Sequence, residues 1–289
     1  MDFKNAQELL ALCEEHQLPI SEIMRQREIT VGESTADSVD SQMKRVLEIM
    51  KDAAFSPIKS PVKSMGGLIG GEAQKLSRHI ASGRGICGDV LEKAITYAMA
   101  TLETNASMGL IVASPTAGSA GIVPGLLLAL QEVYHFSDKE TEKVLFNAGA
   151  IGYLAMRNAT VAGAVGGCQA ETGVAAAMAA SAATELMGGT PLQCTYAAST
   201  VLMNMLGLVC DPVGGLVEYP CQNRNASGVS IALVAAEMAL AGITQFIPLD
   251  EMITFMYTVG RKLPAELRET ALGGCAAAPS ACKACHMCE

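Results

Sequence analysis

Apolar residues recur every three to four positions along the first 60 residues, with polar residues between them. This spacing predicts amphipathic helices at 5–15, from about residue 21, and at 41–54, the last ended by the pair Ser56-Pro57. The following stretch, 60–79, contains two Gly-Gly pairs, which interrupt helices and suggest a backbone that runs close to another group. We expect residues 1–60 to be a helical segment packed on a larger body.

Helix start and stop signals divide the rest of the chain. Residues 137–140 and 190–193 each form a capping box, so a helix begins at both places. The pair Gly188-Gly189 ends the helix before the second box, whereas Pro, Gly and Ser break regularity over 113–125. Further helices are expected from 89 to about 106 and at 171–187, 227–240 and 250–259. No segment shows the alternation of a strand.

Composition supports a helical fold. Half of the 289 residues are hydrophobic, aromatic residues make up 4% and tryptophan is absent, which favours closely packed helices over a β-sandwich. The chain is long enough to bury a large core. We therefore expect one all-α domain.

Charge and targeting features narrow the function. The net charge of −9 and the absence of a Lys/Arg cluster argue against nucleic acid as a partner. The start of the chain lacks the pattern of a signal peptide, so we expect a cytoplasmic protein. The most apolar stretch, 228–247, contains Glu237 and lacks a basic flank, so we interpret it as a buried helix and not as a membrane span.

Ten cysteines in a chain expected to be cytoplasmic favour metal binding or catalysis over disulfides. Cys210 and Cys221 end the segment CDPVGGLVEYPC, whose two prolines and Gly-Gly pair predict a non-helical backbone free to aim thiols at a common point. Cys168 follows a Gly-Gly pair directly before a helix, the position of a ligand, a nucleophile or a buried structural cysteine. With Asp211 and Arg224 nearby, the three thiols indicate a shared metal with one open position.

The other cysteines allow weaker statements. Cys282, Cys285 and Cys288 are spaced like part of an iron-sulfur ligand set, although such runs usually add a fourth cysteine and a proline; an unstructured tail that binds metal adventitiously is the alternative. Three further cysteines in helix-like surroundings are expected to fill the core: Cys13, Cys87 and Cys194. Four isolated histidines are expected at the surface or in hydrogen bonds: His16, His79, His135 and His286.

The segment ASPTAGSAG offers the hydroxyl groups of Ser114, Thr116 and Ser119 together with free backbone amides around Gly118. Such a concavity suits a carboxylate. An ordinary loop with a helix cap explains the same residues equally well.

Four motifs occur in order along the chain: SPTAGSAGIVPG (114–125), GGCQAETG (166–173), CDPVGGLVEYPCQNRNASG (210–228) and RETALGGCA (268–276). Together they closely resemble the α chain, or α domain, of bacterial iron-sulfur L-serine dehydratases, from about residue 60 to the end. The resemblance implies a catalytic domain at 61–274, preceded by the helical segment 1–60 and followed by a Cys-rich tail at 275–289.

The resemblance further implies a 4Fe-4S cluster, and no pyridoxal phosphate, held by Cys168, Cys210 and Cys221. The fourth iron is left for substrate, where it acts as a Lewis acid on the serine hydroxyl. Loss of the α proton then gives aminoacrylate, which tautomerises and hydrolyses to pyruvate and ammonia. In the family a cysteine at or next to the C-terminus can occupy that iron at rest, a position matched by Cys288. Three tail cysteines depart from the family pattern: Cys275, Cys282 and Cys285.

The residues also offer candidates for contact with such a substrate. Ser114, Thr116 and Gly118 are the candidates for holding the substrate carboxylate. Secondary candidates are Arg224 and Asn225 beside the cysteine loop and Lys63, for carboxylate binding or proton transfer. No histidine has the setting of a general base. Single-chain family members carry a β domain with a Ser-Ser-His-Thr motif, which nothing here matches, so a separate β chain that supplies the base is implied.

The sequence alone leaves three other functions open. An L-cysteine desulfidase of the same superfamily would release thiolate in place of hydroxide. A non-catalytic metal or redox sensor would use the tail cysteines as its site. A helical membrane component, suggested by the mean hydropathy of +0.31, lacks paired spans.

Overall fold

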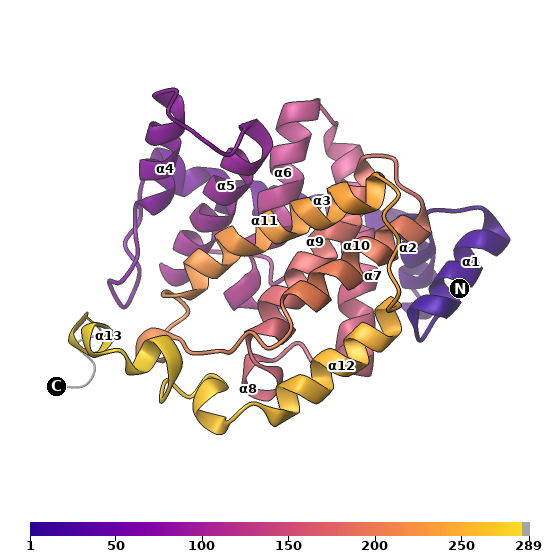
Figure 1. The fold of residues 1–289 in the computed structure, drawn as a ribbon. Coiled ribbons are helices and arrows are strands. Elements are labelled where there is room, and N and C mark those ends of the chain that lie inside the picture. The colour runs from indigo at the N-terminus through magenta and orange to yellow at the C-terminus, as the bar shows by residue number, and fades with distance from the viewer. Residues whose placement is uncertain (285–289) are drawn as a thin grey trace.

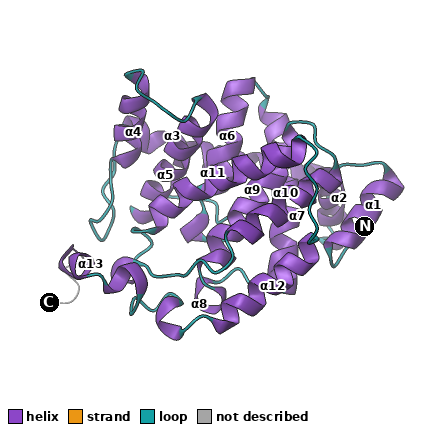
Figure 2. Cartoon of the chain, in the orientation of Figure 1, coloured by secondary structure: helices purple, strands orange, loops and turns teal. Residues whose placement is uncertain are grey.

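The structure is a computed structural model that describes residues 1–284. Over these residues the protein is all-α, as predicted: helices are joined by loops and short 3₁₀ turns, and there is no strand (Figure 2). The helices are α1 (Ala6–His16), α2 (Ile20–Val31), α3 (Ala36–Lys59), α4 (Glu72–Ala81), α5 (Asp89–Ala106), α6 (Ile122–Tyr134), α7 (Asp138–Asn158), α8 (Gly163–Gly166), α9 (Val174–Leu186), α10 (Pro191–Asn204), α11 (Cys221–Leu240), α12 (Leu249–Lys262) and α13 (Pro279–Ala284).

Helix α9 lies at the centre of the protein (Figure 1). Every residue from Val174 to Thr184 is buried, and the helix packs against α6, α7, α10 and α11. Seven of these eleven residues are alanines, whose small side chains let the surrounding helices approach closely. The core is therefore built on small residues, as the low aromatic content predicted.

The predicted end of a helix at Ser56-Pro57 is wrong, because α3 continues through Pro57 to Lys59. A proline inside a helix leaves the carbonyl four residues earlier without its N–H donor. Here that carbonyl belongs to Ala53, and it accepts a hydrogen bond from Thr104 Oγ1 of α5 at 2.8 Å. A contact with another helix thus replaces the missing bond.

The irregular segment expected at 113–125 is shorter than predicted. Helix α6 already begins at Ile122, with Pro124 at its third position, where a backbone N–H has no helical partner to lose. A Cβ atom at Gly121 would lie 2.3 Å from the Ala98 carbonyl oxygen. The start of α6 therefore rests directly on the backbone of α5, an approach that only glycine allows.

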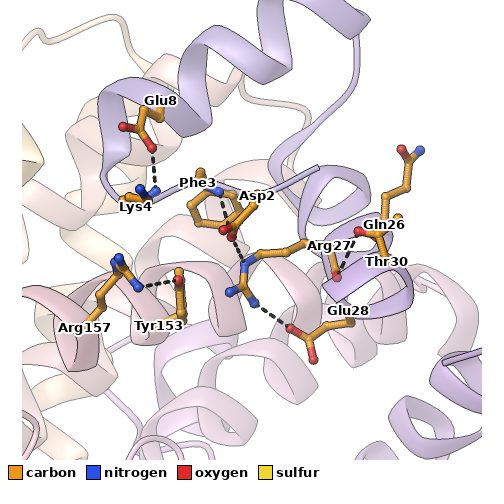
Figure 3. Close-up of polar contacts among 10 residues, drawn as sticks. All are labelled: Asp2, Phe3, Lys4, Glu8, Gln26, Arg27, Glu28, Thr30, Tyr153 and Arg157. Carbon is orange, nitrogen blue, oxygen red and sulfur yellow. Dashed lines mark hydrogen bonds and ion pairs between the residues drawn. The ribbon is translucent and has the colours of Figure 1, made fainter. Parts of the chain in front are cut away.

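The N-terminal segment is fastened to the body by polar and aromatic contacts. The Arg27 guanidinium lies 4.0 Å from the ring centre of Tyr153 and 5.7 Å from that of Phe3, and its Nε donates to Asp2 at 2.9 Å (Figure 3). Asp250 of α12 accepts hydrogen bonds from two backbone N–H groups at the start of α1, at 2.7 and 3.1 Å. An acidic group there stabilises the helix end.

Among the described residues, one stretch is long and apolar enough to cross a membrane by composition, Ala117–Tyr134, and 67% of it is buried within the protein. The stretch 228–247, expected to be a buried helix, is helical only to Leu240 and is buried along one face of α11. Most of each stretch thus belongs to a helix of the packed core, α6 or α11.

Candidate active site

The segment between Cys210 and Cys221 leaves the helical pattern as predicted, apart from a 3₁₀ turn at Val213–Gly215. Cys221 itself is the first residue of α11, six residues before the predicted start. The backbone of Cys210 is paired with the C-terminal region: its N–H donates to the Leu267 carbonyl at 2.9 Å, and its carbonyl accepts from the Glu269 N–H at 2.7 Å. The motif at 268–276 thus lies against the cysteine segment.

Cys168 precedes a π-helical turn, Gln169–Gly173, from which α9 continues at Val174. The helix predicted from residue 171 therefore begins with a wider turn. Single π turns occur frequently at functional sites. The Gln169 side chain accepts from the Gly207 N–H at 2.8 Å, and its own backbone N–H donates to the Leu208 carbonyl at 3.0 Å. These bonds hold Cys168 beside the segment that leads to Cys210.

Cys168, Cys210 and Cys221, called the cysteine triad below, are brought together. Cys168 and Cys210 are both 4% exposed; Cys168 Sγ lies 2.9 Å from Thr172 Oγ1, and Cys210 Sγ donates to Glu171 Oε2 at 3.5 Å. The neighbouring Cys210 thiol is the main cause that lowers the pKa of the Cys168 thiol, and the pKa of Cys210 is raised in turn. Burial raises the pKa of Cys221 to about 12, with the neighbouring Cys168 charge adding to the effect. The three thiols therefore influence one another as members of one site.

Arg224 supplies positive charge beside the cysteine triad. It forms an ion pair with Asp211 at 2.7 Å and donates to the Val209 carbonyl at 2.9 Å. Its charge contributes to lowering the pKa of Cys168. Asp211 is 2% exposed and also accepts the Cys275 N–H at 2.6 Å. The pair thus links the cysteine segment to the C-terminal region.

The loop 114–119 lies next to the cysteine triad. Asn225 is fully buried; its Nδ2 donates to the carbonyls of Gly118 at 2.8 Å and Cys221 at 2.9 Å, while its Oδ1 accepts the Gly121 N–H at 3.0 Å. The side-chain amide is thereby committed to holding the loop beside Cys221. Ser114 Oγ is buried without a hydrogen-bond partner in the described residues, a free polar group within this loop.

Thr116 and Ser119 form a capping box at the 3₁₀ turn Ala117–Ser119, so the helix-cap interpretation of this loop is correct for its local structure. Thr116 Oγ1 also donates to Glu171 at 3.0 Å. The ideal Cβ position at Gly118 lies 3.6 Å from the same carboxylate. The loop therefore has a local cap and a contact with the cysteine site at once.

Two carboxylates at the site were not singled out from the sequence. Glu171 and Glu269 each have an oxygen that lies, with Cys210 Sγ, in a group of three possible metal ligands all within 4.8 Å of one another. Burial raises the pKa of Glu171, and the charge of Glu269 adds to this. Both lie within quoted motifs, Glu171 in 166–173 and Glu269 in 268–276, which was the available signal. The pairing of the Glu269 backbone with Cys210 brings the second carboxylate to the site.

Other predicted residues lie outside this group. Lys63 is exposed, in the segment before α4. Cys13 and Cys194 are buried in helices, as predicted, but Cys87 is exposed in a bend, because glycines at 83, 85 and 88 prevent a helix there. The surface placement of His16, His79 and His135 is confirmed.

The tail is partly ordered, contrary to the expectation of an irregular segment. It forms a 3₁₀ turn at Gly274–Ala277 and the short helix α13, which carries the exposed Cys282. Cys275 is half-buried beside Asp211. Cys285, His286 and Cys288 lie outside the described residues.

The donor set fits an iron-sulfur cluster. Three thiols from different segments lie near enough to shift one another's pKa, two of them are buried, and a cationic side chain lies beside them. Of the three, only Cys210 belongs to a group of possible ligands, among the described residues, whose donor atoms lie within 4.8 Å of one another. A Cβ at Gly163 would lie 3.0 Å from Cys210 Sγ and 2.3 Å from Glu171 Oε2, so glycine keeps the space next to Cys210 open. Thiolates are the protein ligands of such clusters.

Comparison with known proteins shows the family to which this chain belongs. The model of the family described as serine dehydratase alpha chain matches residues 15–276. The motifs had indicated a resemblance only from about residue 60, so the relationship extends further toward the N-terminus than predicted. A probable L-serine dehydratase alpha chain of Bacillus subtilis (strain 168) is 48% identical over 278 residues, covering 96% of this chain and 92% of the relative.

Two further relatives differ in length. The L-serine dehydratase alpha chain of Peptoniphilus asaccharolyticus is 42% identical over 271 residues, covering 94% of this chain and 93% of its own. L-serine dehydratase 1 of Escherichia coli (strain K12) is 36% identical over 283 residues, covering 95% of this chain but 61% of its own. With a match over most of its length, this chain belongs to the serine dehydratase alpha chain family.

Proposed function

We propose that this chain is the α subunit of an iron-sulfur L-serine dehydratase, which converts L-serine to pyruvate and ammonia in the cytoplasm. The observation that carries the proposal is the convergence of Cys168, Cys210 and Cys221 in a chain of this family. The relatives named above are L-serine dehydratases or their α chains.

The cysteine triad would hold three corners of a 4Fe-4S cluster. When bound, such a cluster supplies a Lewis acid that stabilises negative charge on the leaving hydroxyl oxygen. Arg224 favours the thiolate form of Cys168, which metal binding requires. Gly163 leaves room beside Cys210.

The loop 114–119 would orient the substrate. Ser114 and Thr116 offer hydroxyl groups and the backbone around Gly118 offers amides, which suit the substrate carboxylate. Asn225 holds this loop on Cys221, so carboxylate and hydroxyl of one small amino acid would be presented at a fixed separation. Arg224 and Lys63 are further candidates for the carboxylate.

A second polypeptide would complete the enzyme. This chain covers 61% of a single-chain L-serine dehydratase, and the relatives of matching length are named α chains. We infer that a separate β chain supplies what the remainder of the longer relative contains, including the general base. Every histidine that the structure describes lies at the surface, away from the buried cysteines, so none is placed to act as the base there.

The experiment is anaerobic reconstitution of the α chain with iron and sulfide, with and without a coexpressed β chain. Iron and sulfide near four each per α chain, and pyruvate formation from L-serine only in the presence of the β chain, are expected. Parallel assays with L-threonine and L-cysteine determine the leaving group. Full activity of the α chain alone, or faster sulfide release from cysteine than pyruvate formation from serine, would contradict the proposal.

A further inference from the structure

Glu218 is a buried carboxylate, 2% exposed, in the cysteine segment three residues before Cys221. It accepts three hydrogen bonds from the segment before α4: from Ser64 Oγ at 2.7 Å, the Gly66 N–H at 2.6 Å and the Leu68 N–H at 2.9 Å. Hydrogen bonds to a charged group are stronger than those between neutral groups. Glu218 therefore ties two distant parts of the chain together.

The segment 64–69 is shaped around this carboxylate. Ser64 Oγ, which donates to Glu218, also accepts the N–H groups of Gly67 at 3.1 Å and Ile69 at 3.2 Å. Successive backbone amides that converge in this way form an anion-binding concavity. Here the anion is part of the chain itself. The segment is thus held in place by Glu218 and is not an empty ligand loop.

A second buried carboxylate fixes the far end of the same region. Glu103 of α5, 1% exposed, accepts the Ala73 N–H at the start of α4 at 2.9 Å and Gln222 Nε2 at 3.2 Å. Gln222 directly follows Cys221. The region 64–73 is therefore linked to residues on both sides of Cys221.

We propose that Glu218 is a positioning residue that fixes Cys221 and the segment bearing Lys63 relative to each other. Without its carboxylate, the amides of 64–69 lose their acceptor and the turn that leads into Cys221 loses its anchor. The effect on catalysis rests on the proposed function, whereas the effect on the placement of Cys221 does not.

The test compares the Glu218→Gln variant of the full-length chain with the wild type. Both proteins are metal-free and are kept under anaerobic conditions. The glutamine keeps the shape, but its NH2 group cannot accept the backbone N–H bonds. The rate of alkylation of each cysteine by iodoacetamide is followed by peptide mass spectrometry. The Cys221 rate should rise about tenfold or more, as expected for loss of a charge-assisted bond, while that of buried Cys194 stays the same.

A second variant perturbs the same contact from the opposite side. A Cβ at Gly66 would lie 2.8 Å from Glu218 Oε1 and 2.2 Å from Leu216 Cδ1, so Gly66→Ala should displace the carboxylate and also raise the Cys221 rate. Glu92→Gln is the matched control. Glu92 is another buried glutamate, 7% exposed, that accepts a backbone N–H, that of Cys87 at 3.2 Å.

The expected result is a selective rise at Cys221 in both variants and none in the control. An unchanged Cys221 rate in Glu218→Gln would overturn the proposal, as would equal rises at Cys221 and Cys194, which report general loosening. Iron per chain after reconstitution should also fall in Glu218→Gln. If wild type itself binds no iron, the proposed function fails while the alkylation result still decides the role of Glu218.

Discussion

Replacement of Asn225 by alanine should destabilise the protein and loosen the loop 114–119. The side chain makes three hydrogen bonds, one of them fully buried and two partly buried, and its loss leaves the Gly121 N–H and the Gly118 carbonyl without these partners. A buried polar group left unpaired costs about 1–3 kcal/mol. Two such groups predict a decrease of about 2–6 kcal/mol in the free energy of unfolding, or on the order of 10 °C in Tm for a chain of this size.

The assay is urea and thermal unfolding of the metal-free chain, so that cluster binding does not contribute. Asn158→Ala is the control, because Asn158 is exposed and makes one hydrogen bond, to the Lys4 carbonyl at 2.8 Å; its cost should stay below about 1 kcal/mol. In the complex with the β chain, Asn225→Ala should also raise KM for serine. Equal stability of the two variants would refute the reasoning.

Three further predictions concern the metal and the dependence on pH. Replacing any member of the cysteine triad by alanine should remove cluster absorbance and activity together, whereas Cys288→Ala should leave a cluster and change only its activation lag and air sensitivity; equal loss in all four would contradict an open iron. A chain ending at residue 276 should retain iron, and complete loss would favour the sensor interpretation. The hydrogen bond from Arg25 lowers the pKa of the Asp40 carboxyl group in the folded protein. The unfolded chain therefore binds a proton at Asp40 more tightly than the folded protein does. The Arg25–Asp40 pair stabilises the fold above the ordinary carboxyl pKa, and this stabilisation is lost as pH falls through the folded-state pKa. Urea unfolding at several pH values should show that Asp40→Asn lowers the free energy of unfolding at neutral pH and reduces its loss in acid. The change should be less than about 1 kcal/mol, because the pair is half exposed. An unchanged pH dependence in Asp40→Asn would contradict this prediction.

The fold could be predicted where local signals decide it. Capping boxes at Ser137 and Thr190 begin α7 and α10 as expected, because the two capping bonds are formed within four residues. The end of α3 could not be predicted, since its continuation depends on Thr104 of another helix. Local sequence rules thus predict a helix end that is set by bonds within the segment, but not one that depends on a contact with another helix.

The same division holds at the site. The three cysteines stand out through their glycine and proline surroundings. Glu269 and Glu218 lie within the quoted motifs, but nothing local distinguishes them from surface glutamates, because their importance arises from backbone pairing and from amides more than a hundred residues away. A single sequence contains no local mark of such contacts.

The pairing of Cys210 with residues 267 and 269 bears on the order of events during synthesis. The backbone partners of this cysteine are translated after it, so its observed geometry cannot form until residues 267 and 269 have been synthesised. We therefore expect iron delivery to follow synthesis of the segment 267–269. A chain that stops before residue 264 should accordingly fail to retain iron, even though every member of the cysteine triad is present.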